Sequence, residues 1–367
     1  MSELVRRRLR SSRLSGAPLP TAAEAVGWFG AVQAQEFAAA LWSVAQRTRG
    51  APREPDLLRL FDDGALLRTH VLRPTWHFVR PEDIRWLLAL TGPRVHALNG
   101  FMYRQNDLDD AVFARCHALL REALAGGRQL TRGEVADVLA RGGIPAERFR
   151  LAYLLMHAEL EGLICSGALR GRQHTYALLD ERLPAVSPVP ARSRDAALAE
   201  LVCRYYTSHG PATVRDLAWW SSLTLTDVRR GVELAGTDLV REEIDGRVYH
   251  APAHPPPVGP DDAAPTAHLL QGYDEYAASF SESADVSRWP GVALPSRTNR
   301  PVYTHAVAVD GFVVGNWKRT IRATEVTIEV FLSASLDAGQ RRAVEDAADR
   351  FGRFLGRPVT VAFAGPG

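Results

Sequence analysis

Two glutamines separated by one alanine, Gln33-Ala34-Gln35, are the unusual polar residues of the N-terminal region. They precede the Ala-rich segment 37–45, which we expect to be a helix. A neutral amide can orient a water molecule through hydrogen bonds, but it cannot act as a strong base. Taken alone, the pair is explained better by capping of the following helix than by catalysis.

A second group of polar residues follows in a β-rich stretch that ends at residue 79. Thr75 and His77 are two residues apart in the expected strand and share one face, whereas Trp76 points to the other. Arg68 and Arg73 add two guanidinium groups near the same hairpin, which suits contacts to phosphate. The alternative is structural, with His77 hydrogen-bonded inside the core and Trp76 packed there.

Several other chemistries are excluded by absent motifs. The sequence has no Gly-rich phosphate-binding loop, HExxH, paired CxxC or Gly-x-Ser-x-Gly, which argues against NTPases, zinc hydrolases and α/β-hydrolases. The three cysteines match no zinc spacing, and the histidine pair His250 and His254 is interpreted as part of a solvated loop. We therefore expect no metal and no cofactor. Lys318 is the only lysine among 44 basic residues, so Schiff-base catalysis has a single lysine candidate.

The elements that must position these residues form a repeat. Each unit combines helices, several of which begin at a capping Thr, with a closing pair of short strands. The closing strand pairs are expected over 65–79, over 163–166 with 174–179, and over 239–244 with 248–251.

Helices followed by a hairpin are typical of a winged helix. We predict an α+β protein in which three tandem winged-helix modules form a curved DNA-binding scaffold, followed by a C-terminal β-rich region. The expected boundaries are 1–80, 81–190, 191–255 and 256–367. The alternative is a generic α+β scaffold in which hairpins cap helix pairs.

The C-terminal region follows a Pro-rich linker over 251–265 and differs from the repeats. Alternation predicts strands over 268–279, 302–309, 312–317 and 325–332, then a helix over 336–355 and a final strand over 358–363. Asp310-Gly311 is the predicted turn of a hairpin from His305 to Trp317, which we consider either a sheet hairpin or an element that enters a DNA groove.

Composition adds little about partners. Forty-four basic and 42 acidic residues give a net charge of +2, so no global field indicates nucleic acid. No apolar stretch reaches the roughly 18 residues that a membrane helix needs. We expect a cytoplasmic protein without a membrane partner.

The chain resembles the AlkZ-type family of winged-helix DNA glycosylases over nearly its full length. Gln33-Ala34-Gln35 is similar to that family's Gln-apolar-Gln motif, and 73–79 resembles its following strand. The segments 272–276 and 309–319 resemble its C-terminal signatures. The resemblance, with Gln35 where one branch has Asp, implies self-resistance to DNA-alkylating natural products.

The resemblance implies a monofunctional glycosylase that excises bulky N7-alkylguanines from double-stranded DNA, and in some members unhooks interstrand crosslinks. Gln33 and Gln35 would be catalytic, and Thr75, Trp76 and His77 would line the site. The expected DNA contacts are Arg68, Arg73, Lys318 and Arg319.

The competing hypothesis is a non-enzymatic transcription regulator or drug-binding protein. It predicts a symmetric dimer on paired half-sites, whereas three modules in one chain favour a monomer on one duplex site.

Overall fold

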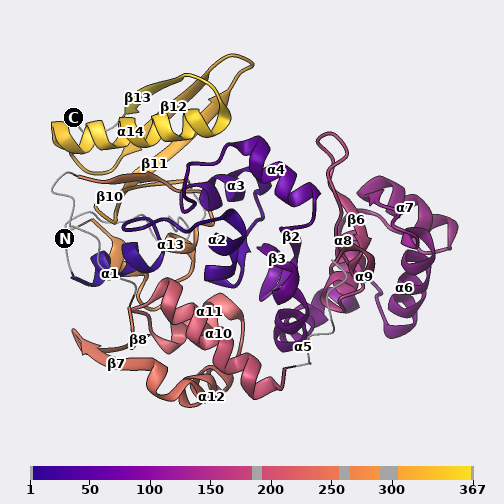
Figure 1. Ribbon diagram of the computed structural model, residues 1–367. Coiled ribbons are helices and arrows are strands. Elements are labelled where there is room, and N and C mark those ends of the chain that lie inside the picture. The colour runs from indigo at the N-terminus through magenta and orange to yellow at the C-terminus, as the bar shows by residue number, and fades with distance from the viewer. Residues whose placement is uncertain (1–2, 184–191, 256–264, 290–304, 365–367) are drawn as a thin grey trace.

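The computed structural model describes residues 3–183, 192–255, 265–289 and 305–364. It is α+β, as predicted, and repeats one arrangement three times (Figure 1). Residues 256–264 of the predicted linker and residues 302–304 of a predicted strand lie outside the described residues.

The first unit begins at Thr21, whose hydroxyl accepts a hydrogen bond from the backbone N–H of Glu24 (3.1 Å). Its short first strand pairs with the second strand of the closing hairpin, giving the sheet order β1-β3-β2. The elements are α2 (Ala22–Phe29), β1 (Val32–Gln33), α3 (Phe37–Ala45), α4 (Glu54–Asp62), β2 (Leu67–Val71) and β3 (Arg73–Val79).

The second unit has the same topology, with the sheet order β4-β6-β5. Thr131 and Glu134 form the predicted capping box at the start of its middle helix. The unit contains α6 (Asp110–Leu124), β4 (Leu130–Thr131), α7 (Arg132–Arg141), α8 (Arg148–Leu160), β5 (Ile164–Ser166), β6 (Thr175–Leu178) and α9 (Leu179–Arg182).

In the third unit, the first strand of the sheet is replaced by a single β-bridge between Ala212 and His250. Thr213 and Asp216 form a capping box at the helix that follows. The unit contains α10 (Arg194–His209), α11 (Val214–Ser221), α12 (Leu225–Ala235), a 3-10 turn (Gly236–Asp238), β7 (Leu239–Ile244) and β8 (Arg247–Pro252).

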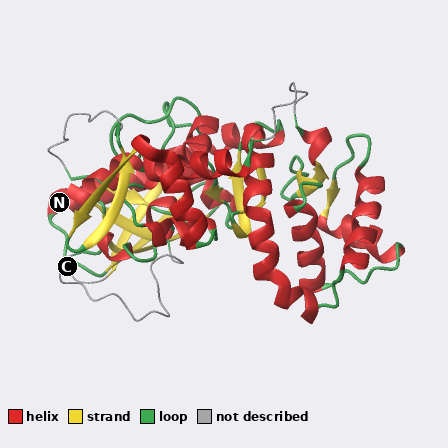
Figure 2. Cartoon of the chain, turned by 90° about the horizontal axis from the view of Figure 1, so that it is seen from below, coloured by secondary structure: helices red, strands yellow, loops and turns green. Residues whose placement is uncertain are grey.

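A long helix, α5 (Pro81–Gln105), joins the first two units and packs on β2, β3, α8 and α10. The second unit consequently lies at one end of an elongated molecule, and the C-terminal sheet lies at the other end (Figures 1 and 2). Among the described helices, none combines the length and the apolar character that a membrane span requires.

The C-terminal region is a five-stranded sheet in the order β13-β12-β11-β10-β9, with only the β12 and β13 pair parallel. Its core is continuous with that of the first unit, since Trp42 of α3 packs against Phe351 at a ring distance of 5.2 Å. The elements are β9 (Ala267–Leu269), α13 (Glu275–Ala278), a 3-10 turn (Ala284–Ser287), β10 (Ala306–Val309), β11 (Phe312–Ile321), β12 (Val326–Leu332), α14 (Ala338–Leu355) and β13 (Val359–Ala364).

The N-terminal helix α1 (Glu3–Ser11) belongs structurally to this end of the molecule. Leu9 shares an apolar cluster with Ala306 and Ala308 of β10. The buried guanidinium of Arg8 donates hydrogen bonds to the carbonyls of Pro211 and Ser283. The helix therefore ties the third unit to the C-terminal region.

The predicted strand over 268–279 is wrong beyond Leu269. There the chain turns, and Asp274 caps α13 by accepting from the backbone N–H of Tyr276 (2.9 Å). Alternation misleads here because polar residues such as Gln271 and Glu275 are buried beside partners from distant segments.

The hairpin from His305 to Trp317 is a sheet hairpin, and its turn does not project toward solvent. Asp310 and Gly311 have φ values of 49° and 79°, and the Gly311 carbonyl accepts a hydrogen bond from the Tyr276 hydroxyl (2.5 Å). A Cβ atom on Gly311 would lie 2.4 Å from Val5 of α1. Of the two alternatives for this hairpin, the structure therefore supports the sheet hairpin, because α1 and Tyr276 cover its turn.

Candidate functional site

Gln33 is placed by strand pairing and by hydrogen bonds that its backbone N–H and carbonyl make with distant residues. It lies opposite His77 in the β1 and β3 pair. Its N–H donates to Glu275 Oε1 (2.8 Å), and its carbonyl accepts from Gln271 Nε2 (3.1 Å). Its side chain is only 6% exposed, and its Oε1 accepts a hydrogen bond from Arg73 Nη2 (2.7 Å).

Gln35 lies two residues further along the chain, and its side chain is exposed. Its Oε1 accepts a hydrogen bond from the Thr75 hydroxyl (2.8 Å). An amide oxygen has two lone pairs, so a second partner can still bind there.

The capping interpretation is not supported, because the N-cap of α3 is Glu36 and its side chain makes no capping bond. The structure instead brings both glutamines to the face of β3 that carries Arg73, Thr75 and His77.

His77 is fully buried beneath this face. Its Nδ1 lies 3.0 Å from the Thr75 carbonyl, to which it donates, and its Nε2 faces Arg73 at 3.5 Å. Burial, reinforced by the charge of Arg73, lowers the pKa of His77 to about 3. The imidazole is therefore neutral near pH 7.

Trp76 lies on the opposite face, as the alternation predicted. The Arg68 guanidinium lies 4.3 Å from its ring, and its indole N–H donates to Glu159 of α8 (3.4 Å). Arg68 itself is 8% exposed and donates to the Ala34 carbonyl (3.0 Å). Burial lowers the pKa of Arg68 to about 10. Buried against the segment that follows β1, Arg68 is placed to hold the backbone of the glutamine motif. It is not placed for the expected phosphate contact.

Lys318 and Arg319 lie on β11, and they differ in their surroundings. Lys318 is exposed, with its ammonium 5.2 Å from the Phe331 ring. Arg319 Nη1 lies 3.4 Å from His305 Nε2. The same His305 Nε2 lies 3.0 Å from Glu36 Oε2. Glu36 follows Gln35 directly, so β11 lies beside the glutamine segment. The His305 hydrogen bond, against the opposing effect of burial, lowers the pKa of Glu36.

The acidic residues behind the site, Asp274 and Glu275, lie in the segment 272–276 that resembles a family signature, but their contacts to the glutamine motif were not predicted. Glu275 accepts hydrogen bonds from the Gln33 N–H, Trp220 Nε1 (2.8 Å), Ser279 Oγ (2.8 Å) and His209 Nε2 (3.2 Å). Burial would raise the pKa of Glu275, but these hydrogen bonds and nearby charges outweigh it and lower that pKa to about 2.

The adjacent Asp274 has an equally defined role. It receives a bidentate contact from Arg47 (2.7 and 3.1 Å) and a hydrogen bond from Ser43 (2.6 Å), both near the end of α3. The segment 272–276 therefore holds β1 and α3 in place. The signal available in the sequence was the resemblance of 272–276 to a family signature.

Comparisons with known proteins agree on one family. The family model described as DNA glycosylase AlkZ-like matches residues 26–354. The chain is similar to an interstrand DNA cross-link repair glycosylase of Streptomyces sahachiroi, with 27% identity over 314 residues and 82% of each chain covered. It also resembles the solved structure of the Streptomyces sahachiroi DNA glycosylase AlkZ, with a TM-score of 0.78, 23% identity and 98% of each chain covered.

Proposed function

Because the chain belongs to the AlkZ-like DNA glycosylase family, we propose that it hydrolyses the N-glycosidic bond of bulky N7-alkylguanine adducts. We extend the proposal to unhooking of interstrand crosslinks, because its Streptomyces sahachiroi relative is described as an interstrand DNA cross-link repair glycosylase. The biological role would be self-resistance to a genotoxic natural product.

The chemistry requires little from the protein. Alkylation at N7 makes the guanine a cation and a good leaving group, and bond cleavage produces an oxocarbenium-like sugar. A positioned water and a polar environment then suffice, and neither requires a strong base.

Gln35 orients the water in this proposal, and Gln33 holds the sugar or accepts the second hydrogen bond of the water. The observation that carries the proposal is the exposed Gln35 amide, whose Oε1 is held by the Thr75 hydroxyl and keeps a lone pair for water. Arg73, which donates to Gln33 Oε1, strengthens the donor character of that amide. Thr75, Trp76 and His77 line or support the site.

The three repeated units act as tandem winged-helix modules on a curved scaffold for double-stranded DNA. Three modules in one chain suit a monomer that follows a single duplex. Arg73, Lys318 and Arg319 would contact the DNA backbone, and buried Arg68 would support the strand instead.

The test is base release from duplex DNA that contains one N7-alkylguanine. Gln35→Ala should slow release by at least about 100-fold, as loss of transition-state positioning does, with little change in DNA affinity. Gln33→Ala should act in the same direction. Gln105→Ala removes an exposed glutamine at the end of α5 and is the matched control.

Unchanged release by the Gln33→Ala, Gln35→Ala double variant would contradict the catalytic assignment. DNA binding without any base release by the wild-type protein would favour the non-enzymatic regulator.

A further inference from the structure

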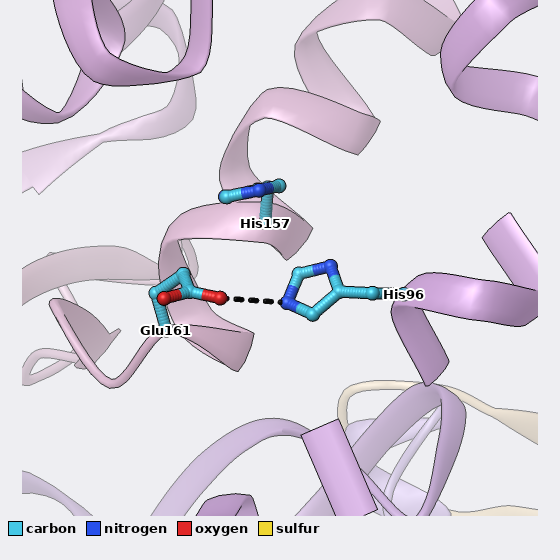
Figure 3. Close-up of side chains that lie close together, drawn as sticks. All are labelled: His96, His157 and Glu161. Atoms are coloured by element: carbon cyan, nitrogen blue, oxygen red, sulfur yellow. Dashed lines mark ion pairs between the residues drawn. The ribbon is translucent and has the colours of Figure 1, made fainter. Parts of the chain in front are cut away.

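Figure 3 shows a cluster of imidazole and carboxylate groups made by His96, His157 and Glu161. None of these residues contacts Gln33 or Gln35 among the described hydrogen bonds. His96 comes from α5, whereas His157 and Glu161 stand four residues apart at the end of α8. One nitrogen or oxygen of each lies within 4.8 Å of the others. Residues four apart on a helix share one face, so the two α8 groups approach His96 together.

The ring of His96 is aimed into this cluster. Its Nδ1 lies 2.9 Å from the Tyr103 hydroxyl, and its Nε2 lies 3.0 Å from Glu161 Oε1. Within the described residues, this buried Nε2 has no hydrogen bond of acceptable geometry. A metal placed between this nitrogen and the Glu161 carboxylate would therefore displace no well-aligned hydrogen bond.

His157 is held in the orientation that a ligand needs. Its ring stacks on Phe113 with centroids 3.7 Å apart. Its Nδ1 lies 3.2 Å from Nε2 of His117, which leaves Nε2 of His157 for a metal. An outer partner of this kind fixes the tautomer of ligating histidines.

We propose that His96, His157 and Glu161 bind a divalent transition metal of the zinc type that clamps α5 to α8. Two imidazoles and one carboxylate are a donor set that Zn²⁺ uses, with a fourth position left for water. Tetrahedral ligands lie roughly 3.3 Å apart, so the three side chains, now within 4.8 Å of one another, must draw together around a metal. The Glu161 side chain is 52% exposed and can rotate. His96 and Glu161 also line a surface cavity of about 450 Å³, through which a metal can enter.

The metal would stiffen α8, which contacts the β2–β3 hairpin beside the glutamines. Between His157 and Glu161, α8 carries Glu159, which contacts His70 of β2 and Trp76 of β3. The inference does not depend on the proposed DNA chemistry, because it concerns binding of the metal alone.

The experiment is titration of chelator-treated full-length protein with Zn²⁺ in a calorimeter, followed by thermal unfolding with and without the metal. We expect one saturable site per chain and a higher unfolding temperature when it is filled. Glu161→Gln and His96→Gln should each weaken binding by at least about tenfold, a loss that even an outer partner can cause.

His254→Gln is the matched control, because His254 is an exposed histidine in the loop after β8. It should bind like the wild type. The proposal is overturned if the wild type shows no saturable binding, or if Glu161→Gln and His96→Gln both bind like the control. Glu161→Gln changes an exposed side chain, so its result does not depend on a disrupted fold.

Discussion

At the scale of single residues, the Thr75 hydroxyl decides where the Gln35 amide lies. It donates to Gln35 Oε1 over 2.8 Å, and this bond is the anchor that the structure describes for an otherwise exposed side chain. A residue that only positions a catalytic group should affect the rate of the chemical step more than the binding of DNA.

We therefore expect Thr75→Val to lower kcat for base release about tenfold, the equivalent of one hydrogen bond of about 1.4 kcal/mol. Single-turnover kinetics at saturating DNA would measure it. Thr75→Ser keeps the hydroxyl and should restore most of the rate. A Thr75→Ser variant as slow as Thr75→Val would contradict the assignment of the effect to the hydroxyl.

Glu275 gives a second prediction at this scale. Its pKa is lowered to about 2, so the folded state binds its proton more weakly than the unfolded chain, whose Glu pKa is near the usual 4.5. The stabilisation by this carboxylate is complete above about pH 4.5 and is lost as the pH falls toward 2.

Glu275→Gln should accordingly lower the free energy of unfolding by about 3 kcal/mol at pH 7, because several buried donors lose a charged acceptor. Denaturant unfolding from pH 7 to pH 3 would measure the difference between variant and wild type, which should shrink as the pH falls. A difference that is constant over this range would contradict the ionised state of Glu275.

At the scale of elements, two tight turns of similar sequence have different surroundings. Asp245-Gly246 and Asp310-Gly311 each combine an Asp and a Gly with positive φ. A Cβ on Gly246 would meet open space, whereas one on Gly311 would clash with α1 and with the Tyr276 hydroxyl. The first turn is a surface hairpin, and the second is part of the core.

Gly246→Ala should cost about 1 kcal/mol of stability, the usual penalty for positive φ at a residue with a side chain. Gly311→Ala adds overpacking and should cost about 3 kcal/mol or more. Thermal unfolding of both variants would measure the contrast. Equal losses would mean that the 310–311 turn is as open as its counterpart.

At the scale of the whole molecule, the position of individual charges matters more for DNA binding than their sum. The net charge is only +2, so DNA binding must use local cations. Trp317 packs on Phe351 of α14, and the next residue of the strand, Lys318, therefore faces away from that helix.

Lys318→Gln should lower the magnitude of the log–log salt slope on duplex DNA by roughly 0.9, the contribution of one phosphate contact. Arg342→Gln, an exposed change on α14, should leave the slope unchanged. Fluorescence anisotropy across a salt series would measure both. An equal reduction of the slope by Arg342→Gln and Lys318→Gln would contradict a specific phosphate contact by Lys318.

The single lysine also bears on the reaction as a whole. Hydrolysis by a positioned water leaves an abasic site with an intact strand, whereas strand cleavage through a Schiff base needs an amine. We expect no protein–DNA adduct after borohydride treatment of the reaction. Trapping that disappears in Lys318→Gln would contradict a monofunctional enzyme.

The sequence by itself determined the local elements. Capping residues such as Thr131 and Thr213 begin helices where expected, and Asp-Gly pairs close the predicted hairpins. Alternation placed Thr75 and His77 on one face and Trp76 on the other. These features depend on backbone preferences and on residues a few positions apart, which a sequence displays directly.

Only the tertiary structure decided which distant groups meet. Glu275 reaches Gln33 across 242 positions of the chain, and the turn at Gly311 becomes buried because α1 covers it. The approach of His96 to His157 likewise depends on how α5 crosses α8. Such contacts follow from packing between elements, and local patterns do not encode the path of one element over another. For the same physical reason, the resemblance located the glutamines, and the tertiary structure decided that one is buried and the other is exposed.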